Sequence, residues 1–160
     1  MVRMLKRASQ AWRSQSHPDR PRVLVEDPNG AFRDADFRAF ESAGLDVALC
    51  TGPDAENDCP LHDAKQCALV ARADVVLFGL GTTDERSRAV LRALRACYPE
   101  TPVVVEVPRE RSPDEDGLPE GCIALAFPAS IDGQTRVLWE ALAASQAAKR
   151  QRRSGRAEPH

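Results

Sequence analysis

Residues 74–83 of the chain read DVVLFGLGTT, and this stretch decides the fold. The apolar run over residues 75–78 has the length of a strand, and its lack of polar alternation is typical of a strand buried on both faces of a parallel sheet. Gly79 and Gly81 then lead into a predicted helix over residues 84–98, where apolar side chains recur at helical spacing. Parallel strands need such helical crossovers, so the stretch predicts an α/β fold.

The same alternation of strand and helix patterns fills the chain on both sides of this stretch. Further strands are predicted over residues 22–26, 46–50, 102–107 and 122–127, and further helices over residues 34–44, 63–72 and 131–148. Residues 108–121 are rich in proline, glycine and charge, so the fourth helix is expected to be short or missing. The pattern predicts one doubly wound, five-stranded parallel sheet covered by helices on both faces.

Length and composition place the chain among folded single domains. It has 160 residues, of which 42% are hydrophobic and 29% charged. No apolar run reaches the roughly 18 residues that a membrane span needs, and the basic N-terminus lacks the apolar segment of a secretory signal. Five cysteines are an odd number, which argues against a disulfide framework. We therefore expect a cytoplasmic protein with no membrane partner.

Charge divides the chain into three parts. Residues 1–20 are predicted to form a basic arm, residues 21–148 the folded domain, and residues 149–160 a basic, disordered tail. Residues 23–148 hold 11 basic and 22 acidic side chains. The ends either stay solvated, fold back on the acidic body or contact an anionic surface. A nucleic acid is not expected to bind except through these ends, because the acidic body would repel it.

Four short motifs make the chain resemble the receiver domain of bacterial two-component response regulators. They are Glu26-Asp27 after the first strand, DVVLF over residues 74–78, TPVVV over residues 101–105, and Phe127-Pro128 after the fifth strand. The resemblance covers about residues 21–148. It implies a flavodoxin-like sheet of strand order 2-1-3-4-5, with the site at the carboxyl ends of the strands.

The resemblance also implies which residues would form the site. The acidic pair that holds Mg²⁺ in receivers corresponds to Glu26 and Asp27. Both residues are still acidic, and carboxylate oxygens suit a hard cation. Without a third carboxylate we favour a remnant pair that binds no metal, so no cofactor is expected.

The other functional positions of receivers have lost the groups that their chemistry needs. The phosphoacceptor aspartate falls on Gly79, the switching hydroxyl residue on Val107, and the lysine on Phe127, while the following Pro128 is kept. Glycine cannot attack phosphorus, and no nearby residue is an obvious substitute. The resemblance therefore implies a degenerate pseudo-receiver. Such a module is not an enzyme, is independent of phosphorylation, and acts through a protein partner or a homodimer.

A second hypothesis uses the turn after the third strand. Gly79, Gly81, Thr82 and Thr83 could cradle a phosphate or another small ligand with bare N–H groups at a helix N-terminus. The chain would then be a flavodoxin-like sensor or enzyme. The simpler interpretation is a capped turn of small residues, because the P-loop pattern is absent.

Cys50, Cys59, His62 and Cys67 form a loose cluster in the sequence. They could hold Zn²⁺, or Cys59 and Cys67 could form a reversible disulfide. The spacing matches no strong zinc signature, so we favour cysteines that are small buried hydrophobes.

The burial of four more residues is predicted less directly. Cys97 and Cys122 are predicted to lie in the core. Glu106 interrupts an apolar strand, and it lies either near the exposed end of that strand or buried with a raised pKa. Trp139, on the flank of the last helix, is either an interface anchor or half-buried against the sheet.

Overall fold

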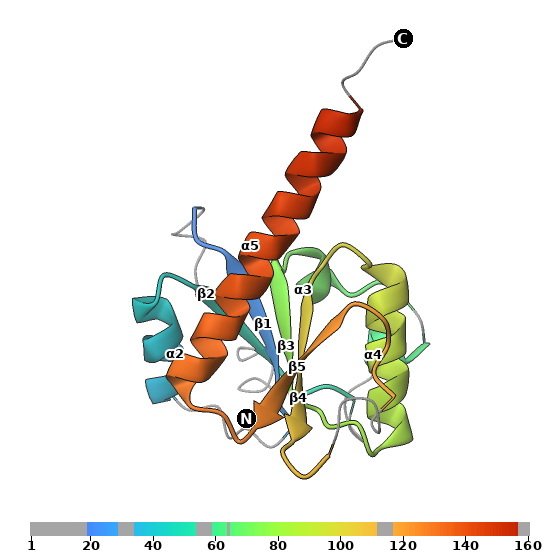
Figure 1. Ribbon diagram of the computed structural model, residues 1–160. Helices are drawn as coiled ribbons and strands as arrows, with labels where there is room; N and C mark the ends of the chain where they lie inside the picture. The colour runs from blue at the N-terminus through green and yellow to red at the C-terminus, as the bar shows by residue number, and fades with distance from the viewer. Residues whose placement is uncertain (1–18, 29–33, 54–58, 64, 112–116, 157–160) are drawn as a thin grey trace.

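The computed structural model describes residues 19–28, 34–53, 59–63, 65–111 and 117–156. Five strands form one sheet: β1 (Arg22–Glu26), β2 (Asp46–Cys50), β3 (Val75–Phe78), β4 (Val103–Pro108) and β5 (Cys122–Phe127). All neighbouring strands are parallel, in the order β2-β1-β3-β4-β5 (Figure 1). The predicted α/β fold and its strand order 2-1-3-4-5 are confirmed.

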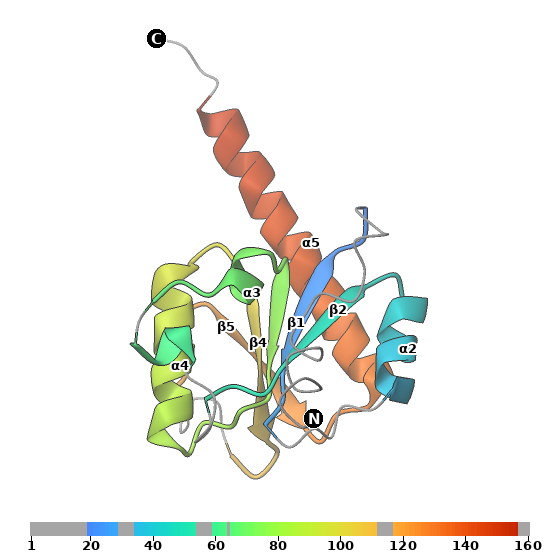
Figure 2. The same cartoon turned by 180° about the vertical axis from the view of Figure 1, so that it is seen from behind.

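Helices cover both faces of the sheet (Figures 1 and 2). On one face lie α2 (Asp34–Ser42) and α5 (Ile131–Gly155), and on the other lie the 3₁₀ turn η1 (Pro60–Asp63), α3 (Ala68–Ala71) and α4 (Glu85–Cys97). Strand alternation sends Val23, Val25, Leu77 and Val104 toward α5, and Leu24, Phe78, Val105 and Val107 toward α4.

Two hydrophobic cores result from this layering. Phe37, Phe40 and Leu138 are fully or almost fully buried on the α2 and α5 side. Val90 and Leu94 of α4 are fully buried on the opposite side. Burial of these side chains from water holds the helices on the sheet.

The cysteine predictions for the core are only half right. Cys97 is exposed because it is the last residue of α4, beyond the part of the helix that lies on the sheet. Cys122 is half-buried in the core under α4. Trp139 lies on the flank of α5, where its indole Nε1 donates to the carbonyl of Ala43 at 3.3 Å.

The helix predicted over residues 63–72 is wrong in extent. Only Ala68–Ala71 is helical, and Cys67 before it is extended. The Cys67 N–H donates to the Tyr98 hydroxyl at 2.8 Å, and this hydroxyl donates to the Cys67 carbonyl at 3.1 Å. The Cys67 N–H is thus bonded to a distant side chain, while the Cys67 carbonyl also accepts the first helical bond of α3, from the Ala71 N–H at 3.0 Å.

The chain between β4 and β5 has no helix in the described residues 109–111 and 117–121. This agrees with the prediction of a short or missing fourth helix. Ala124 and Ala126 of β5 are consequently exposed, and β5 forms an open edge of the sheet beside β4.

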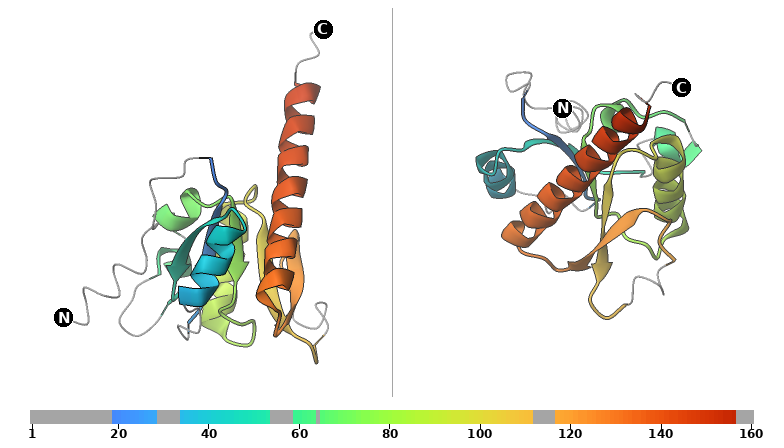
Figure 3. Two further views of the ribbon diagram at one scale, coloured as in Figure 1. Left: turned by 90° about the vertical axis from the view of Figure 1, so that its left-hand side faces the viewer. Right: turned by 45° about the horizontal axis from the view of Figure 1, so that its top comes forward.

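Helix α5 runs to Gly155, so residues 149–155 are helical where a disordered tail was predicted. Its last turns extend well beyond the sheet (Figure 3). The basic side chains there are exposed, and Arg152 pairs with Glu100 at 2.9 Å. Most of the predicted basic arm, and residues 157–160, lie outside the described residues.

Candidate functional site

Strand order reverses between β1 and β3, and ligands of doubly wound sheets collect at the carboxyl ends of the strands near such a point. A cavity of about 470 Å³ opens there. Its walls include three carboxyl groups, those of Asp27, Asp36 and Glu106, together with Gly79 and Gln134. Neither lysine nor arginine lines this cavity among the residues that the structure describes.

Glu106 occupies the space beside Gly79. A Cβ atom placed on Gly79 would lie 2.9 Å from Glu106 Oε2 and 2.8 Å from the carbonyl oxygen of Glu26. Real Cβ atoms essentially never come so close, and the Glu26 carbonyl belongs to the backbone of a central strand. The sequence offered no obvious substitute for the lost aspartate near Gly79, but the structure brings the Glu106 carboxyl group there from the neighbouring strand.

Strand geometry explains the position of Glu106. Side chains alternate along β4, so Glu106 shares the face of Val104 and points toward α5. The amide Nε2 of Gln134, in the first turns of α5, donates to Glu106 Oε1 at 2.7 Å. The carboxyl group is thus held from the helix side while its second oxygen lies beside Gly79.

Burial raises the pKa of Glu106 above its ordinary value. The hydrogen bond from Gln134 opposes this effect, and the negative charge of Asp27 adds to it. The sequence left open an exposed Glu106 or a buried one with a raised pKa, and the structure shows a half-buried side chain whose pKa is raised.

The acidic pair Glu26-Asp27 is divided between two sides of the sheet. Glu26 and Asp27 both border the cavity that holds Glu106. Alternation along β1, however, puts the Glu26 side chain on the face of Leu24, toward η1 and α3, where it lines a second cavity. Glu26 is only 3% exposed, and its buried Oε2 has no hydrogen-bond partner. Burial raises its pKa to about 8. The two carboxyl groups do not converge on one cation.

The remaining predicted pocket residues are also separated. Val107 is buried on the α4 face and does not line the cavity. Phe127 lines the cavity and is 49% exposed. Pro128 follows it across a cis peptide bond, and its carbonyl accepts a bond from Arg109 at 2.9 Å. The structure therefore brings Asp27, Gly79 and Phe127 together, adds Glu106 and Gln134, and leaves Val107 out.

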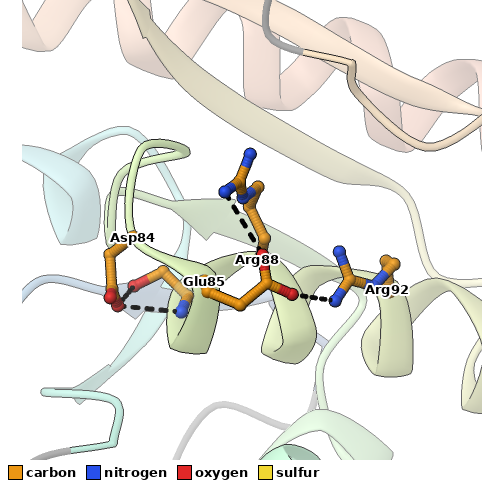
Figure 4. Close-up of polar contacts among 5 residues, drawn as sticks. Asp84, Glu85, Arg88 and Arg92 are labelled. Atoms are coloured by element: carbon orange, nitrogen blue, oxygen red, sulfur yellow. Dashed lines mark hydrogen bonds and ion pairs between the residues drawn. The ribbon is translucent and has the colours of Figure 1, made fainter.

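The turn from Gly79 to Thr83 does not present its hydroxyl groups as a cradle. Thr82 is buried and its Oγ1 has no hydrogen-bond partner, while Thr83 is exposed. The N-terminus of α4 is already capped, because Asp84 accepts a bond from the Ser87 N–H at 3.1 Å (Figure 4). A phosphate at this helix end would compete with the carboxylate of Asp84.

Glu85 adds a second negative charge to the first turn of α4. It pairs with Arg88 at 3.2 Å and with Arg92 at 2.6 Å (Figure 4). These contacts place the two arginines along the helix, away from its N-terminus. The phosphate-cradle hypothesis thus has less support in this geometry than the capped turn.

The cysteine cluster is only partly assembled. Cys50, Cys59 and Cys67 are half-buried around Glu26, but His62 is exposed, with its Nδ1 3.6 Å from Asp63. All five cysteines lie in the described residues, and none is in a disulfide. No three His, Cys, Asp or Glu side chains of the described ranges are placed to hold a metal ion.

No protein-family model matches the sequence, and no curated protein matches it. Solved structures do match the fold. A CheY-like response regulator receiver domain protein from Methanospirillum hungatei JF-1 superposes with a TM-score of 0.61 at 15% identity, over 81% of this chain and 99% of that chain. NtrX from Brucella abortus in complex with ATP gives a TM-score of 0.60 at 20% identity, over 81% of this chain and 28% of that chain.

A structure described as adenylate cyclase from Rhodopirellula baltica gives a TM-score of 0.64 at 12% identity, over 87% of this chain and 99% of that chain. At identities this low, the comparisons show the fold alone. The chain has the fold of response regulator receiver domains. No helix in the described ranges is long and apolar enough to cross a membrane.

Glu26 makes the stability of the fold depend on pH. Its pKa is 4.5 when exposed and about 8 in the folded chain, so between these values the folded state binds the extra proton. The free energy of unfolding therefore falls as pH rises through this window, by up to about 1.4 kcal/mol per pH unit. Glu26→Gln removes this loss, so the variant is expected to gain stability over the wild type as pH rises.

Urea unfolding of both proteins at pH 5.5 and 7.5 measures the effect. Glu140→Gln, at an exposed position of α5, controls for the loss of a surface carboxylate. A stability difference between Glu26→Gln and wild type that stays constant with pH would contradict the assignment.

Proposed function

We propose that this chain is a receiver-like signalling module that works without phosphorylation and acts through contact with another protein chain. The receiver fold supports a role in signalling. One observation carries the first part of the proposal: Glu106 Oε2 lies 2.9 Å from the position that a Cβ of residue 79 would take. The space for a phosphoacceptor side chain on β3 is filled from β4.

The charges of the cavity argue against phosphoryl transfer. An acyl phosphate needs an ionised carboxylate as nucleophile, and it adds a doubly negative group that must be neutralised. Burial raises the pKa of Glu106, which disfavours its ionised form. A phosphoryl group in the cavity would face Asp27 and Asp36, with no lysine or arginine from the described residues in the walls.

The phosphorylation test is direct. After incubation with acetyl phosphate and Mg²⁺, the intact mass of the chain is expected to stay unchanged, and beryllofluoride should leave the amide NMR spectrum unchanged. A receiver domain that carries its aspartate is the positive control. Stoichiometric phosphate that disappears in Glu106→Gln would overturn this part of the proposal and make Glu106 the acceptor.

The open edge of β5 supports the second part of the proposal. The strand has no charged residue or proline, the usual protections of an exposed edge. Ala124 and Ala126 are exposed on one face, and the Phe127 side chain at the end of the strand is 49% exposed. We take a second copy of the chain as the occupant, because two such strands can pair without opposing like charges.

Sedimentation over a concentration series tests this contact. The wild type is expected to dimerise, and Ala126→Lys should shift it to monomer, because a charge would then enter the paired edge. Ala143→Lys, at an exposed position of α5, is the matched control and should dimerise as the wild type does. Equal dimerisation of all three proteins, or a wild type that stays monomeric throughout the series, would contradict the β5 contact.

This proposal includes no enzymatic reaction, no cofactor and no nucleic acid. The odd number of cysteines, five, argues against a disulfide framework, so we propose a reducing compartment, the cytoplasm, as the location of the module.

A further inference from the structure

A second cavity lies on the other face of the sheet from Glu106. It has a volume of about 290 Å³, near the lower end of the range for small-molecule sites. Its walls are mostly apolar, formed by Leu24, Leu61 and Leu69 and by the three thiol side chains of Cys50, Cys59 and Cys67. Among the lining residues that the structure describes, Glu26 supplies the one carboxyl group.

The Glu26 carboxyl group faces this cavity. Leu24, two residues before Glu26 on the same face of β1, lines this cavity too. Cys50, which pairs with Glu26 on the neighbouring strand β2, also lines it. Cys50 and Cys59 line the same cavity as Glu26, and the negative charge of Glu26 adds to the burial that raises the pKa values of both thiols.

Glu26 is the group in these walls that lacks a partner. Its Oε2 is buried without a hydrogen bond. Burying such an oxygen costs about 1–3 kcal/mol of lost hydration unless a hydrogen-bond donor takes the place of water. Backbone N–H groups, in contrast, interact with two of the thiols. Cys50 Sγ accepts from the Gly52 N–H at 3.4 Å, and the backbone N–H groups of His62 and Leu61 partly oppose the rise in the pKa of Cys59.

The walls are held in place independently of any ligand. The two hydrogen bonds between Tyr98 of α4 and the backbone of Cys67 fix the segment before α3. Leu61 of η1 is buried against the same core. Pro60 and Ala68 are exposed beside the cavity, so it is open to solvent at this side.

The chemistry of the walls selects the ligand. Burial raises the pKa of Cys50 to about 12 and also raises that of Cys59, so these thiols are neutral, poor metal ligands and poor nucleophiles. The described residues include no group of three or more His, Cys, Asp or Glu side chains placed to hold a metal ion. Neither lysine nor arginine is among the described residues that line the cavity. A ligand that complements these walls would therefore carry a positively charged N–H donor on an apolar body.

We propose that this cavity binds a small apolar amine or amidine whose N–H group donates to Glu26 Oε2, with its hydrocarbon part against Leu24, Leu61 and the three thiols. The bond is charge-assisted, which makes it stronger than a neutral hydrogen bond. The inference is independent of the proposed signalling function, because the cavity lies on the opposite face from Glu106.

Benzylamine and benzyl alcohol are the probes, since they differ chiefly in the cationic group. The titration of the wild type is followed by amide NMR at pH 8.5, above the pKa of about 8 of the Glu26 carboxyl group, so that this group is ionised. Benzylamine is expected to bind at least about tenfold more tightly than benzyl alcohol. The shifted amides should be those around the cavity, including Gly52, Leu61 and Cys67. Shifts confined to Gly79 and Gln134 would place the ligand in the other cavity and overturn the proposal.

Two variants complete the test. Glu26→Gln keeps the shape of the side chain and removes its charge, so benzylamine should lose about tenfold or more in affinity and bind no better than benzyl alcohol. Glu106→Gln makes the same change in the other cavity and should leave benzylamine binding unchanged. No binding of benzylamine at millimolar concentration, or equal binding to wild type and Glu26→Gln, would overturn the proposal.

Discussion

The contact between the Glu106 carboxyl group and the backbone at Gly79 is the constraint on which the rest of the site depends. The sheet brings the ends of β3 and β4 side by side, and strand alternation turns Glu106 toward α5. Gln134 then fixes the carboxyl group in place. A side chain at position 79 is excluded by Glu106 and also by the Glu26 carbonyl, so only glycine fits there without a shift of its neighbours.

The same strand alternation separates two acidic environments that adjoin in sequence. Asp27 joins Glu106 in the cavity at the strand ends, whereas the Glu26 side chain enters an apolar cavity lined by thiols. Each environment lacks a cation from the described residues. Burial accordingly raises the pKa of Glu26 and of Glu106. The buried carboxyl group of Glu26 and the half-buried one of Glu106 have different neighbours on opposite faces of one sheet.

Much of the fold was predictable because apolar runs such as residues 75–78 have only one suitable environment, the interior of a parallel sheet. The helix over residues 63–72 was not, because a hydroxyl group from Tyr98, far along the chain, holds Cys67 extended. The arrangement of the candidate site was harder to predict than the fold. Alternation along β4 could have predicted which face of the sheet the Glu106 side chain occupies. Its distance from Gly79 depends on where β3 and β4 end relative to each other, and no local sequence pattern predicts that.

A double-mutant cycle between Gly79→Ala and Glu106→Ala measures this contact most directly. Gly79→Ala is expected to destabilise the wild type by roughly 1–3 kcal/mol, as overpacking does. Part of this cost, about 1 kcal/mol, is expected to disappear in the Glu106→Ala background. Gly155→Ala, at a glycine with open space around it, is the control that should cost nothing. Strict additivity of the two substitutions, or a Gly79→Ala chain as stable as the wild type, would contradict the account.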